Sequence, residues 1–332
     1  KKKKKLNLSL GSFALHSNTT GSQSTAVGHT ALYSSTATGT PNNTAVGFQA
    51  AYTNTTGATN TAIGSNALFA NTTASNNTAV GYQSLYTNTT GTRNTALGTQ
   101  ALKTVATGNH NTAVGYQALE LNTGNNNTAV GDQALEANTS GANNSAVGDD
   151  ALVANTTGAR NVAMGASALG SNTSASNNTA VGYQAGYANT TGAQNTFVGT
   201  ISGDANTSGS ENASLGYWSL TENTTGNHNV ALGSRSLKSN TTASYNTSVG
   251  YEAGYANTTG NVAAFGAQAL KSNTTGSYNT AVGGSALQSN TTANFNTSVG
   301  FQSSYTNTTG GYNTAVGYLS LFSNTTGSFF FF

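Results

Sequence analysis

The chain contains no cysteine, a single proline and a single methionine among its 332 residues. Without cysteine it can form no disulfide and offers no thiolate ligand to a metal ion. Charged side chains make up only 6% of the residues. No apolar run in the sequence approaches the roughly 20 residues that a membrane-spanning helix needs. These absences exclude a disulfide-stabilised scaffold, and we expect no membrane insertion by this segment.

Positive charge is also scarce once the first five residues are set aside. Lys1 to Lys5 supply five of the eleven basic side chains, which leaves six against nine acidic ones, a net charge of −3 (6 − 9). Binding of nucleic acid requires a basic patch or stripe. The rest of the sequence has none, and we expect no nucleic-acid partner.

What the sequence does contain is one motif, Asn-Thr-Ala-Val-Gly-x-Gln-Ala-Leu-x-x-Asn-Thr-Thr-Gly-x-x, repeated along the chain. The glycine after the valine, called the anchor glycine below, recurs mostly every 17 residues; the spacing is 19 once and 16 twice, at Gly115–Gly131 and Gly250–Gly266. Such a short, regular period predicts a stacked structure in which each repeat contacts its neighbours. The nineteen anchor glycines are Gly11, Gly28, Gly47, Gly64, Gly81, Gly98, Gly115, Gly131, Gly148, Gly165, Gly182, Gly199, Gly216, Gly233, Gly250, Gly266, Gly283, Gly300 and Gly317.

Seventeen residues are too few for a pair of helices, and the unit is rich in β-branched residues punctuated by glycine. This pattern indicates a short strand, a bend, a second short strand and a turn. We therefore predict an all-β fold, a parallel β-solenoid (β-roll) of about 19 coils with a 17-residue repeat. It would occupy residues 6–328 as a single array. Residues 1–5 and 329–332 depart from the repeat, and we interpret them as atypical tails: a tag, a placeholder or excised ends.

In such a stack each repeat position becomes a column of like side chains. The apolar residue before the anchor glycine forms one column, and the leucine four residues after it forms another. We expect both columns to line the core. Representative members are Val27, Val46, Val80, Val114 and Val130 in the first column, and Leu68, Leu85 and Leu119 in the second.

Four positions of the leucine column hold a smaller residue that is followed at once by tyrosine. We expect the ring to swing inward and replace the missing volume, because packed cores conserve volume under exchange. Gly203 is followed by Asp204 instead, which predicts a local packing defect. The four pairs are Ala51 with Tyr52, Gly186 with Tyr187, Gly254 with Tyr255 and Ser304 with Tyr305.

Alanine or serine fills two further columns, two residues before and three residues after the anchor glycine, as at Ala26 and Ala31. Small side chains let neighbouring chains approach closely, and a single coil offers few large apolar groups of its own. We therefore expect copies of the chain to associate laterally through these small faces, most simply as a homotrimer.

Asparagine forms two nearly unbroken columns, which predict amide ladders that run from coil to coil. The same residues create many Asn-x-Ser/Thr sequons, which are glycosylation acceptors in a pathway that modifies them; we favour the ladder as the reason for the asparagines. One column includes Asn43, Asn60, Asn77, Asn94, Asn111, Asn127 and Asn144, and the other includes Asn54, Asn71, Asn88, Asn122, Asn138 and Asn155.

An aromatic stripe is the first candidate binding surface. Tyr245, Tyr278, Phe295 and Tyr312 share the position five residues before the anchor glycine, where earlier coils carry Asn, Arg or His. Stacked rings would stabilise the ladder, which is the reading we favour. The alternative is a platform for sugar rings or for a partner surface.

Acidic residues gather in adjacent coils and form the candidate metal site. Carboxylates one coil apart repel each other unless they are solvated or bridged by a cation such as Ca²⁺. A solvated patch is the favoured interpretation and a weak cation site the alternative. The residues are Glu120, Asp132, Glu136, Asp149 and Asp150.

Nothing in the sequence points to catalysis. The four histidines, His16, His29, His110 and His228, occupy variable repeat positions without a recurring nucleophile or carboxylate partner. The glycines punctuate strands and do not lead into helices, so no phosphate-binding loop is implied. We predict that the chain is not an enzyme, has no catalytic residues and uses no cofactor.

The phrase Asn-Thr-Ala-Val-Gly-Tyr-Gln-Ala-Leu at Asn111–Leu119 resembles the head repeats of YadA-like trimeric autotransporter adhesins. It is also similar to repeats of bacteriophage tail-fibre proteins and large bacterial surface proteins. The resemblance implies a parallel β-roll, a homotrimer, and an extracellular place on a cell surface or a virion fibre. It further implies a host-surface glycan or protein as partner. The repeat here is longer than the usual head unit because of its Asn-Thr-Thr-Gly turn.

The sequence therefore favours a structural extracellular fibre or adhesin segment, a rigid repetitive rod for attachment or display. One alternative is a solenoid surface that binds polysaccharide or ice through regular threonine columns. Another is a subunit that polymerises end to end into a filament, since solenoid ends are open sheet edges. The threonines are Thr55, Thr72, Thr89, Thr156 and Thr190.

Overall fold

The computed structural model describes residues 6–331 and contains two compact units, the first ending at Asn161 and the second beginning at Val162. Within residues 6–331 the regular structure of both units consists of short strands. The lysine tail at 1–5 and Phe332 lie outside the described residues. The prediction of one array over residues 6–328 stays a prediction.

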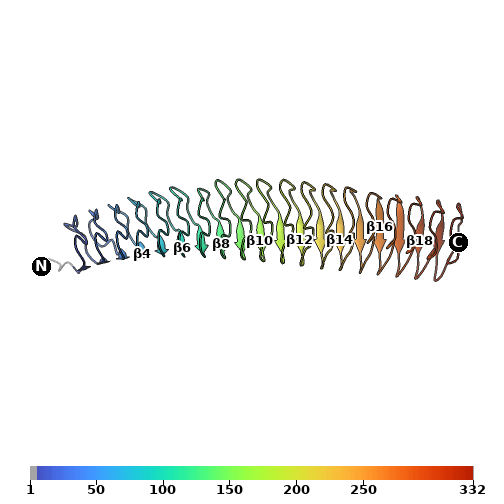
Figure 1. The fold of residues 1–332 in the computed structure, drawn as a ribbon, viewed down its shortest axis with the longest axis horizontal. Helices are drawn as coiled ribbons and strands as arrows, with labels where there is room; N and C mark the ends of the chain where they lie inside the picture. The colour runs from blue at the N-terminus through green and yellow to red at the C-terminus, as the bar shows by residue number, and fades with distance from the viewer. Residues whose placement is uncertain (1–5, 332) are drawn as a thin grey trace. The chain divides into compact units, whose positions relative to one another are not determined.

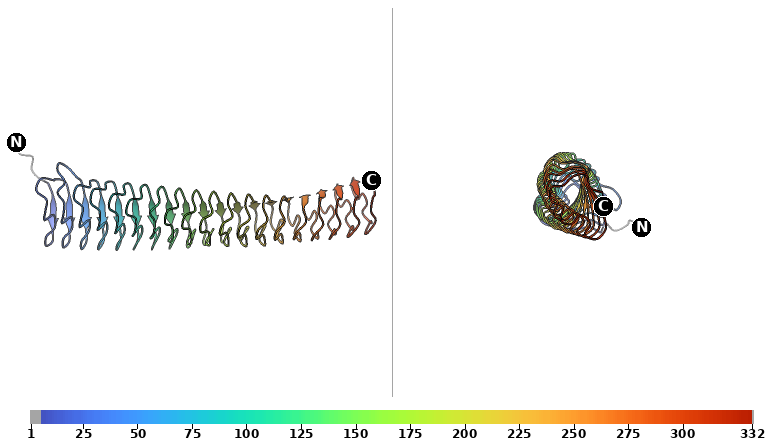
Figure 2. Two further views of the ribbon diagram at one scale, coloured as in Figure 1. Left: turned by 90° about the horizontal axis from the view of Figure 1, so that it is seen from above. Right: turned by 90° about the vertical axis from the view of Figure 1, so that its right-hand side faces the viewer.

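In each unit the strands pair in parallel and in chain order, one strand per coil (Figure 1). Within each unit, successive coils lie side by side along the solenoid (Figure 2). The first unit holds β1 (Leu8–Leu10), β2 (Thr25–Val27), β3 (Thr44–Val46), β4 (Thr61–Ile63), β5 (Thr78–Val80), β6 (Thr95–Leu97), β7 (Thr112–Val114), β8 (Thr128–Val130) and β9 (Ser145–Val147). The second holds β10 (Val162–Met164), β11 (Thr179–Val181), β12 (Thr196–Val198), β13 (Ala213–Leu215), β14 (Val230–Leu232), β15 (Thr247–Val249), β16 (Val262–Phe265), β17 (Asn279–Val282), β18 (Thr297–Val299) and β19 (Thr314–Val316).

The register of the sheet follows the sequence period. Val80 pairs with Leu97 across 17 residues, and Val114 pairs with Val130 across the shorter step of 16. The all-β parallel solenoid with a repeat of about 17 residues is confirmed.

Each coil has one strand, so the predicted second strand at the leucine is wrong. In the coil of β7, Gln117 and Leu119 have φ angles of 52° and 53°, in the left-handed region that side chains other than glycine and asparagine rarely adopt. Two left-handed residues so close together curl the chain and prevent an extended strand. Where glycine replaces the leucine, at Gly186, Gly203 and Gly254, φ stays near 60° (60°, 59° and 58°) and the steric cost disappears.

The anchor glycine is required by its close contact with the next coil. The φ angles in this column lie between 126° and 142°. A Cβ on Gly64 would lie 2.6 Å from the carbonyl oxygen of Gly81, well inside van der Waals contact. The close contact and the positive φ together exclude a side chain at this position.

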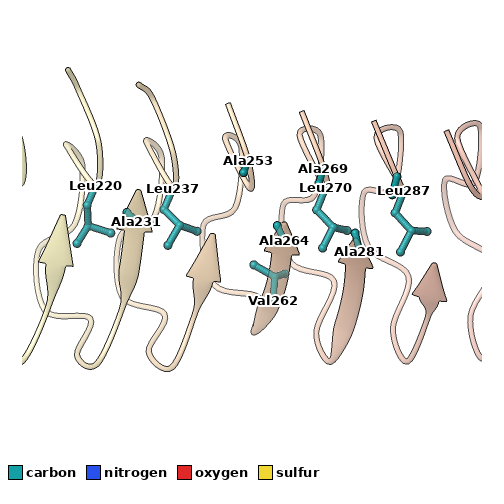
Figure 3. Close-up of a cluster of buried hydrophobic side chains, with 11 residues drawn as sticks. Leu220, Ala231, Leu237, Ala253, Val262, Ala264, Ala269, Leu270, Ala281 and Leu287 are labelled. Carbon is teal, nitrogen blue, oxygen red and sulfur yellow. The ribbon is translucent and has the colours of Figure 1, made fainter. Parts of the chain in front are cut away.

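The core is built from the alanine and leucine columns, as Figure 3 shows for one cluster of the second unit. Ala26, Ala31, Leu68, Leu85 and Leu119 are completely buried. The prediction that copies of the chain associate through the alanine faces is therefore wrong, because these faces point into the coil.

The valine column was predicted as core, and this is wrong. Val27, Val46, Val80 and Val114 are only half-buried, and Val130 is exposed. Side chains alternate along a strand, so the alanine in the middle of Thr-Ala-Val faces inward and both of its neighbours face outward.

Buried asparagines form the predicted ladders. Asn94 donates its backbone N–H to Oδ1 of Asn77 (2.9 Å) and its Nδ2 to the carbonyl of Gly108 (2.7 Å), while its own Oδ1 accepts the backbone N–H of Asn111 (2.9 Å). In the second column Nδ2 of Asn71 donates to Oδ1 of Asn54 (2.6 Å). The ladders satisfy turn backbone groups that the narrow coil hides from water.

The volume lost from the leucine column is not replaced by the following tyrosine. Tyr52 lies on the outer face between Tyr33 and Phe69, with ring centroids 5.1 and 5.3 Å away, and Tyr187 is exposed. Phe197 lies two residues before an anchor glycine, in a column that otherwise holds alanine or serine. Its ring is completely buried and fills the space at both Gly186 and Gly203. The expected packing defect at Gly203 is therefore also wrong.

Residues 329–331 continue the contacts between coils although their sequence departs from the repeat. Phe329 stacks on Tyr312 at 5.0 Å, the backbone N–H of Phe330 donates to Oδ1 of Asn313 (2.9 Å), and Phe331 bridges to Thr314. These phenylalanines follow the backbone path of one further coil.

Candidate functional site

The structure assembles the predicted aromatic stripe into two separate ring stacks. Tyr278 and Phe295 stack at 5.2 Å between centroids, and Phe295 and Tyr312 at 4.9 Å. Tyr245 stacks instead on His228, at 4.8 Å. Left-handed φ angles of 58° to 62° at the four stripe positions turn each ring outward at the same point of its coil.

Between the two stacks lies an open position. A pocket of about 370 Å³ separates Tyr245 from Tyr278 and lies over β15, β16 and β17. Its remaining lining comes from Thr247, Asn261, Val262, Ala263, Asn279 and Thr280. No ionisable group other than the two tyrosine hydroxyls lines it, so the pocket suits a neutral ligand.

A second aromatic column, five residues after the anchor glycine, was missed by the sequence analysis. His16, Tyr33, Tyr52, Phe69 and Tyr86 form a continuous stack in the first unit, with centroids 4.8 to 5.3 Å apart and planes within 14° of parallel. The signal was present: a ring recurs at one repeat position in consecutive coils, but we interpreted one of these rings, Tyr52, as a core replacement.

Large apolar side chains also remain exposed on either side of the anchor glycine. In the first unit, Leu97 is 47% exposed and Tyr116 49%. In the second, Leu215 is 53% exposed and Tyr183 50%. These two positions, called the flanking columns below, repeat along each unit as a surface of apolar groups.

The acidic residues do not gather into a metal site. Across residues 6–331 no three His, Cys, Asp or Glu side chains are placed to hold a metal ion. Glu120 is buried and uses both carboxylate oxygens, one with Nζ of Lys103 (3.0 Å) and one with Nε2 of Gln117 (2.7 Å). Asp132 and Asp149 are exposed.

The pKa values of two of these acids, Glu136 and Asp150, are raised. Burial raises the pKa of Glu136, and the charges of Glu120, Asp150 and Asp132 raise it further. Burial also raises the pKa of Asp150, with contributions from Asp149 and Asp132. The patch is one of repelling, partly solvated carboxylates, consistent with the favoured interpretation.

The sequence analysis also missed an ion cluster around the buried Glu252 in the second unit. The Glu252 carboxylate contacts Nζ of Lys271 at 2.7 Å and Nη1 of Arg235 at 3.4 Å, and accepts a hydrogen bond from Nε2 of Gln268 at 3.2 Å. Hydrogen bonding, first from Lys271, lowers the pKa of Glu252 to about 2 despite the opposing effect of burial. These residues belong to adjacent coils, so the cluster ties three coils together.

We predict that Glu252→Gln lowers the free energy of unfolding by about 2 kcal/mol at neutral pH. The folded-state pKa lies below the ordinary value of 4.5, so this stabilisation is present above that value and is lost as the pH falls towards about 2. Denaturant unfolding followed by circular dichroism should therefore separate the two proteins at neutral pH and show equal stability near the lower limit. Glu222→Gln, at an exposed pair with Lys238, is the control with a smaller loss. An equal deficit at both pH values would contradict the assignment.

Asp204, beside the glycine predicted as a defect, holds an unusual carboxyl group. Burial raises its pKa to about 6, against the lowering effect of backbone hydrogen bonds, and its Oδ1 has no hydrogen-bond partner in the described part of the chain. It occupies the position that carries a ring in the preceding coil, Tyr187. Loss of contact with water explains the raised pKa, and the nearby charge of Glu222 adds to it.

The threonines and sequons serve the ladder. Oγ1 of Thr55 donates to the carbonyl of Thr72 (2.9 Å), and Oγ1 of Thr72 to that of Thr89 (3.2 Å), so the proton of each hydroxyl is used within the ladder. The sequon asparagines Asn54 and Asn138 are completely buried, and each donates Nδ2 to a turn carbonyl. A glycan cannot be attached to either nitrogen in this fold.

Within residues 6–331 no helix has the length and apolar character needed to cross a bilayer. No protein-family model matches the sequence, and comparison with curated proteins finds no match.

Proposed function

We propose that this chain is a structural, non-enzymatic solenoid that associates laterally with copies of itself to form a stiff extracellular fibre or adhesin segment. The observation that carries the proposal is the exposure of the flanking columns. Leu97 and Tyr116 leave large apolar groups in water, although alanine and leucine fill the interior. Apolar surface of this extent marks an interaction site on most soluble proteins.

A second copy of the chain is the partner that fits this surface best. The flanking columns repeat at the rise of the coil, about 4.8 Å per strand. An equally spaced ladder can match such a surface over many coils, whereas a partner without that period would match it at only a few positions. Association through these columns would also add apolar burial to coils whose own core is mainly alanine, leucine and asparagine amides.

Three chains around one axis and an extracellular setting complete the proposal. Both are supported by the resemblance of Asn111–Leu119 to trimeric adhesin heads and tail-fibre repeats. The scarcity of charged residues and the absence of cysteine are compatible with a three-chain assembly and with an extracellular setting. In this role the protein supplies reach and stiffness, and its contacts are distributed along its faces.

Light scattering coupled to size exclusion tests the association. We expect a mass three times the 33.3 kDa of one chain. The variant Leu97→Lys/Tyr116→Lys places charge in the flanking columns and is expected to dissociate at the same concentration, because charges are not easily buried in an apolar interface.

The control variant Thr90→Lys/Thr107→Lys adds equal charge at exposed turn positions of neighbouring coils and should keep the native mass. Circular dichroism of each variant checks that the fold is retained. A native chain that stays monomeric at high concentration, or an oligomer that survives the flanking-column variant, would refute lateral association through this surface.

A further inference from the structure

The aromatic stripe of the second unit is interrupted by the loss of one residue. The step from Gly250 to Gly266 is 16 residues, one shorter than the usual repeat. Asn261 occupies the place that Ser277 has in the next coil, since its carbonyl accepts the backbone N–H of Tyr278 (2.7 Å) as that of Ser277 accepts the N–H of Phe295 (3.1 Å). Val262 then pairs with Asn279. The missing residue is therefore the one at the stripe position, which carries Tyr245 and Tyr278 in the neighbouring coils.

The backbone closes around this deletion without a break in the ladder. The backbone N–H of Val262 donates to Oδ1 of Asn246 (2.7 Å), and β16 and β17 are each one residue longer than most strands. The other 16-residue step, Gly115–Gly131, shortens the Asn122-Thr123-Gly124 turn and retains Asn126 at the stripe position. A short coil therefore need not lose its outward side chain.

What the deletion leaves is a slot of the thickness of one ring. Neighbouring rings in this column stack with centroids 4.8 to 5.2 Å apart. Two coil steps place the rings of Tyr245 and Tyr278 about 10 Å apart, so one ring between them would lie at ordinary stacking distance from both. The exposed fractions agree: Tyr245 is 70% exposed and Tyr278 65%, against 46% for Phe295, which is covered on both faces.

The slot combines two aromatic faces with a neutral polar floor and rim. Thr247, Asn261 and Thr280 contribute hydroxyl and amide groups, and these side chains form no hydrogen bond within the described part of the chain. A pyranose ring offers C–H groups on its faces to the aromatic rings and hydroxyl groups at its edge to such donors and acceptors. A purely aromatic ligand would leave the polar groups unused, and an ionic ligand would find no counter-charge.

We propose that the slot between Tyr245 and Tyr278 is a binding site for one neutral pyranose ring of a glycan chain. The two tyrosine rings sandwich the sugar, and Thr247, Asn261 and Thr280 bond its hydroxyls. The open ends of the slot let the rest of the glycan extend away from the solenoid surface. This binding goes beyond the structural role proposed above and does not depend on self-association.

The test is titration of the full chain with cellohexaose, maltohexaose and chitohexaose, followed by saturation-transfer NMR and calorimetry. We expect saturable binding of at least one of them. Tyr278→Ala should weaken that binding about tenfold or more, because it removes one face of the sandwich. Tyr312→Ala, in the same column but away from the slot, is the matched control and should bind as the native chain does.

A second variant distinguishes loss of the binding site from loss of the fold. Insertion of tyrosine between Asn261 and Val262 restores the 17-residue step and fills the slot with the chain's own ring. It should abolish binding while the thermal unfolding temperature is maintained or raised. Binding that survives the insertion, no binding of any of the three sugars, or binding of indole in place of the sugars would each overturn the proposal. The mass measurement on the same samples reports separately on self-association.

Discussion

Asn94→Asp is expected to lower the free energy of unfolding by about 3–5 kcal/mol at neutral pH. The substitution exchanges Nδ2, which donates to the carbonyl of Gly108, for an oxygen that repels it. Asn94 is completely buried, so the carboxylate would be ionised without a counter-charge or would have to take up a proton. Denaturant unfolding monitored by circular dichroism measures the loss.

The pH dependence of this variant distinguishes the electrostatic cause from a general packing defect. The folded state should raise the pKa of the introduced carboxyl group, so the destabilisation should be greatest at high pH and diminish as the pH falls through that value. Asn126→Asp makes the same chemical change at an exposed position and should leave stability within about 0.5 kcal/mol of the native chain. If both variants lost equal stability, the buried ladder would not be the source of the effect.

Phe197→Ala is expected to cost about 3–5 kcal/mol of unfolding free energy. The ring is completely buried, and it fills the space of two missing leucine side chains, at Gly186 and Gly203. Removing it would leave a cavity across two coils that the hydrogen-bonded backbone cannot close by collapse. The same denaturant measurement reports the loss.

Rescue of this variant is the more specific test. In the native chain, Gly203→Leu should destabilise, because a Cβ at that position would collide with the ring of Phe197. The triple variant Phe197→Ala/Gly186→Leu/Gly203→Leu restores the arrangement of the other coils and should regain most of the lost stability. Leucine accepts the left-handed conformation there, as Leu220 does with φ of 50°. A triple variant no more stable than Phe197→Ala would show that the ring does not substitute for the leucines.

Much of the fold could be predicted because the sequence repeats with a nearly constant period. Residues one repeat apart must meet if the coils stack, which was enough to place Val114 opposite Val130 and to predict the asparagine ladders. The conformation within one coil could not be predicted in the same way. Gln117 and Leu119 are not residue types that signal positive φ, although the glycines at 186, 203 and 254 in the leucine column hinted at it.

The candidate sites were likewise predictable in part: the sequence showed which residues share a position, but not how their side chains are arranged. The shared position of Tyr278, Phe295 and Tyr312 was visible in the sequence, and the rings do stack. The pocket beside Tyr278 depends on how the backbone absorbs one deleted residue, which no count of spacing reveals. The acidic cluster was visible too, but whether carboxylates converge on a cation depends on side-chain directions.

By itself the sequence determined the period, the parallel stacking and the identity of each column, because hydrogen-bonded coils of equal length bring like residues into register. Only the tertiary structure decided which columns face inward. Valine and leucine are equally apolar, yet the alternation of the strand turns Val130 outward and the left-handed turn directs Leu135 into the coil. The direction of a side chain is a property of the closed coil, and the closed coil exists only once its neighbours are in place.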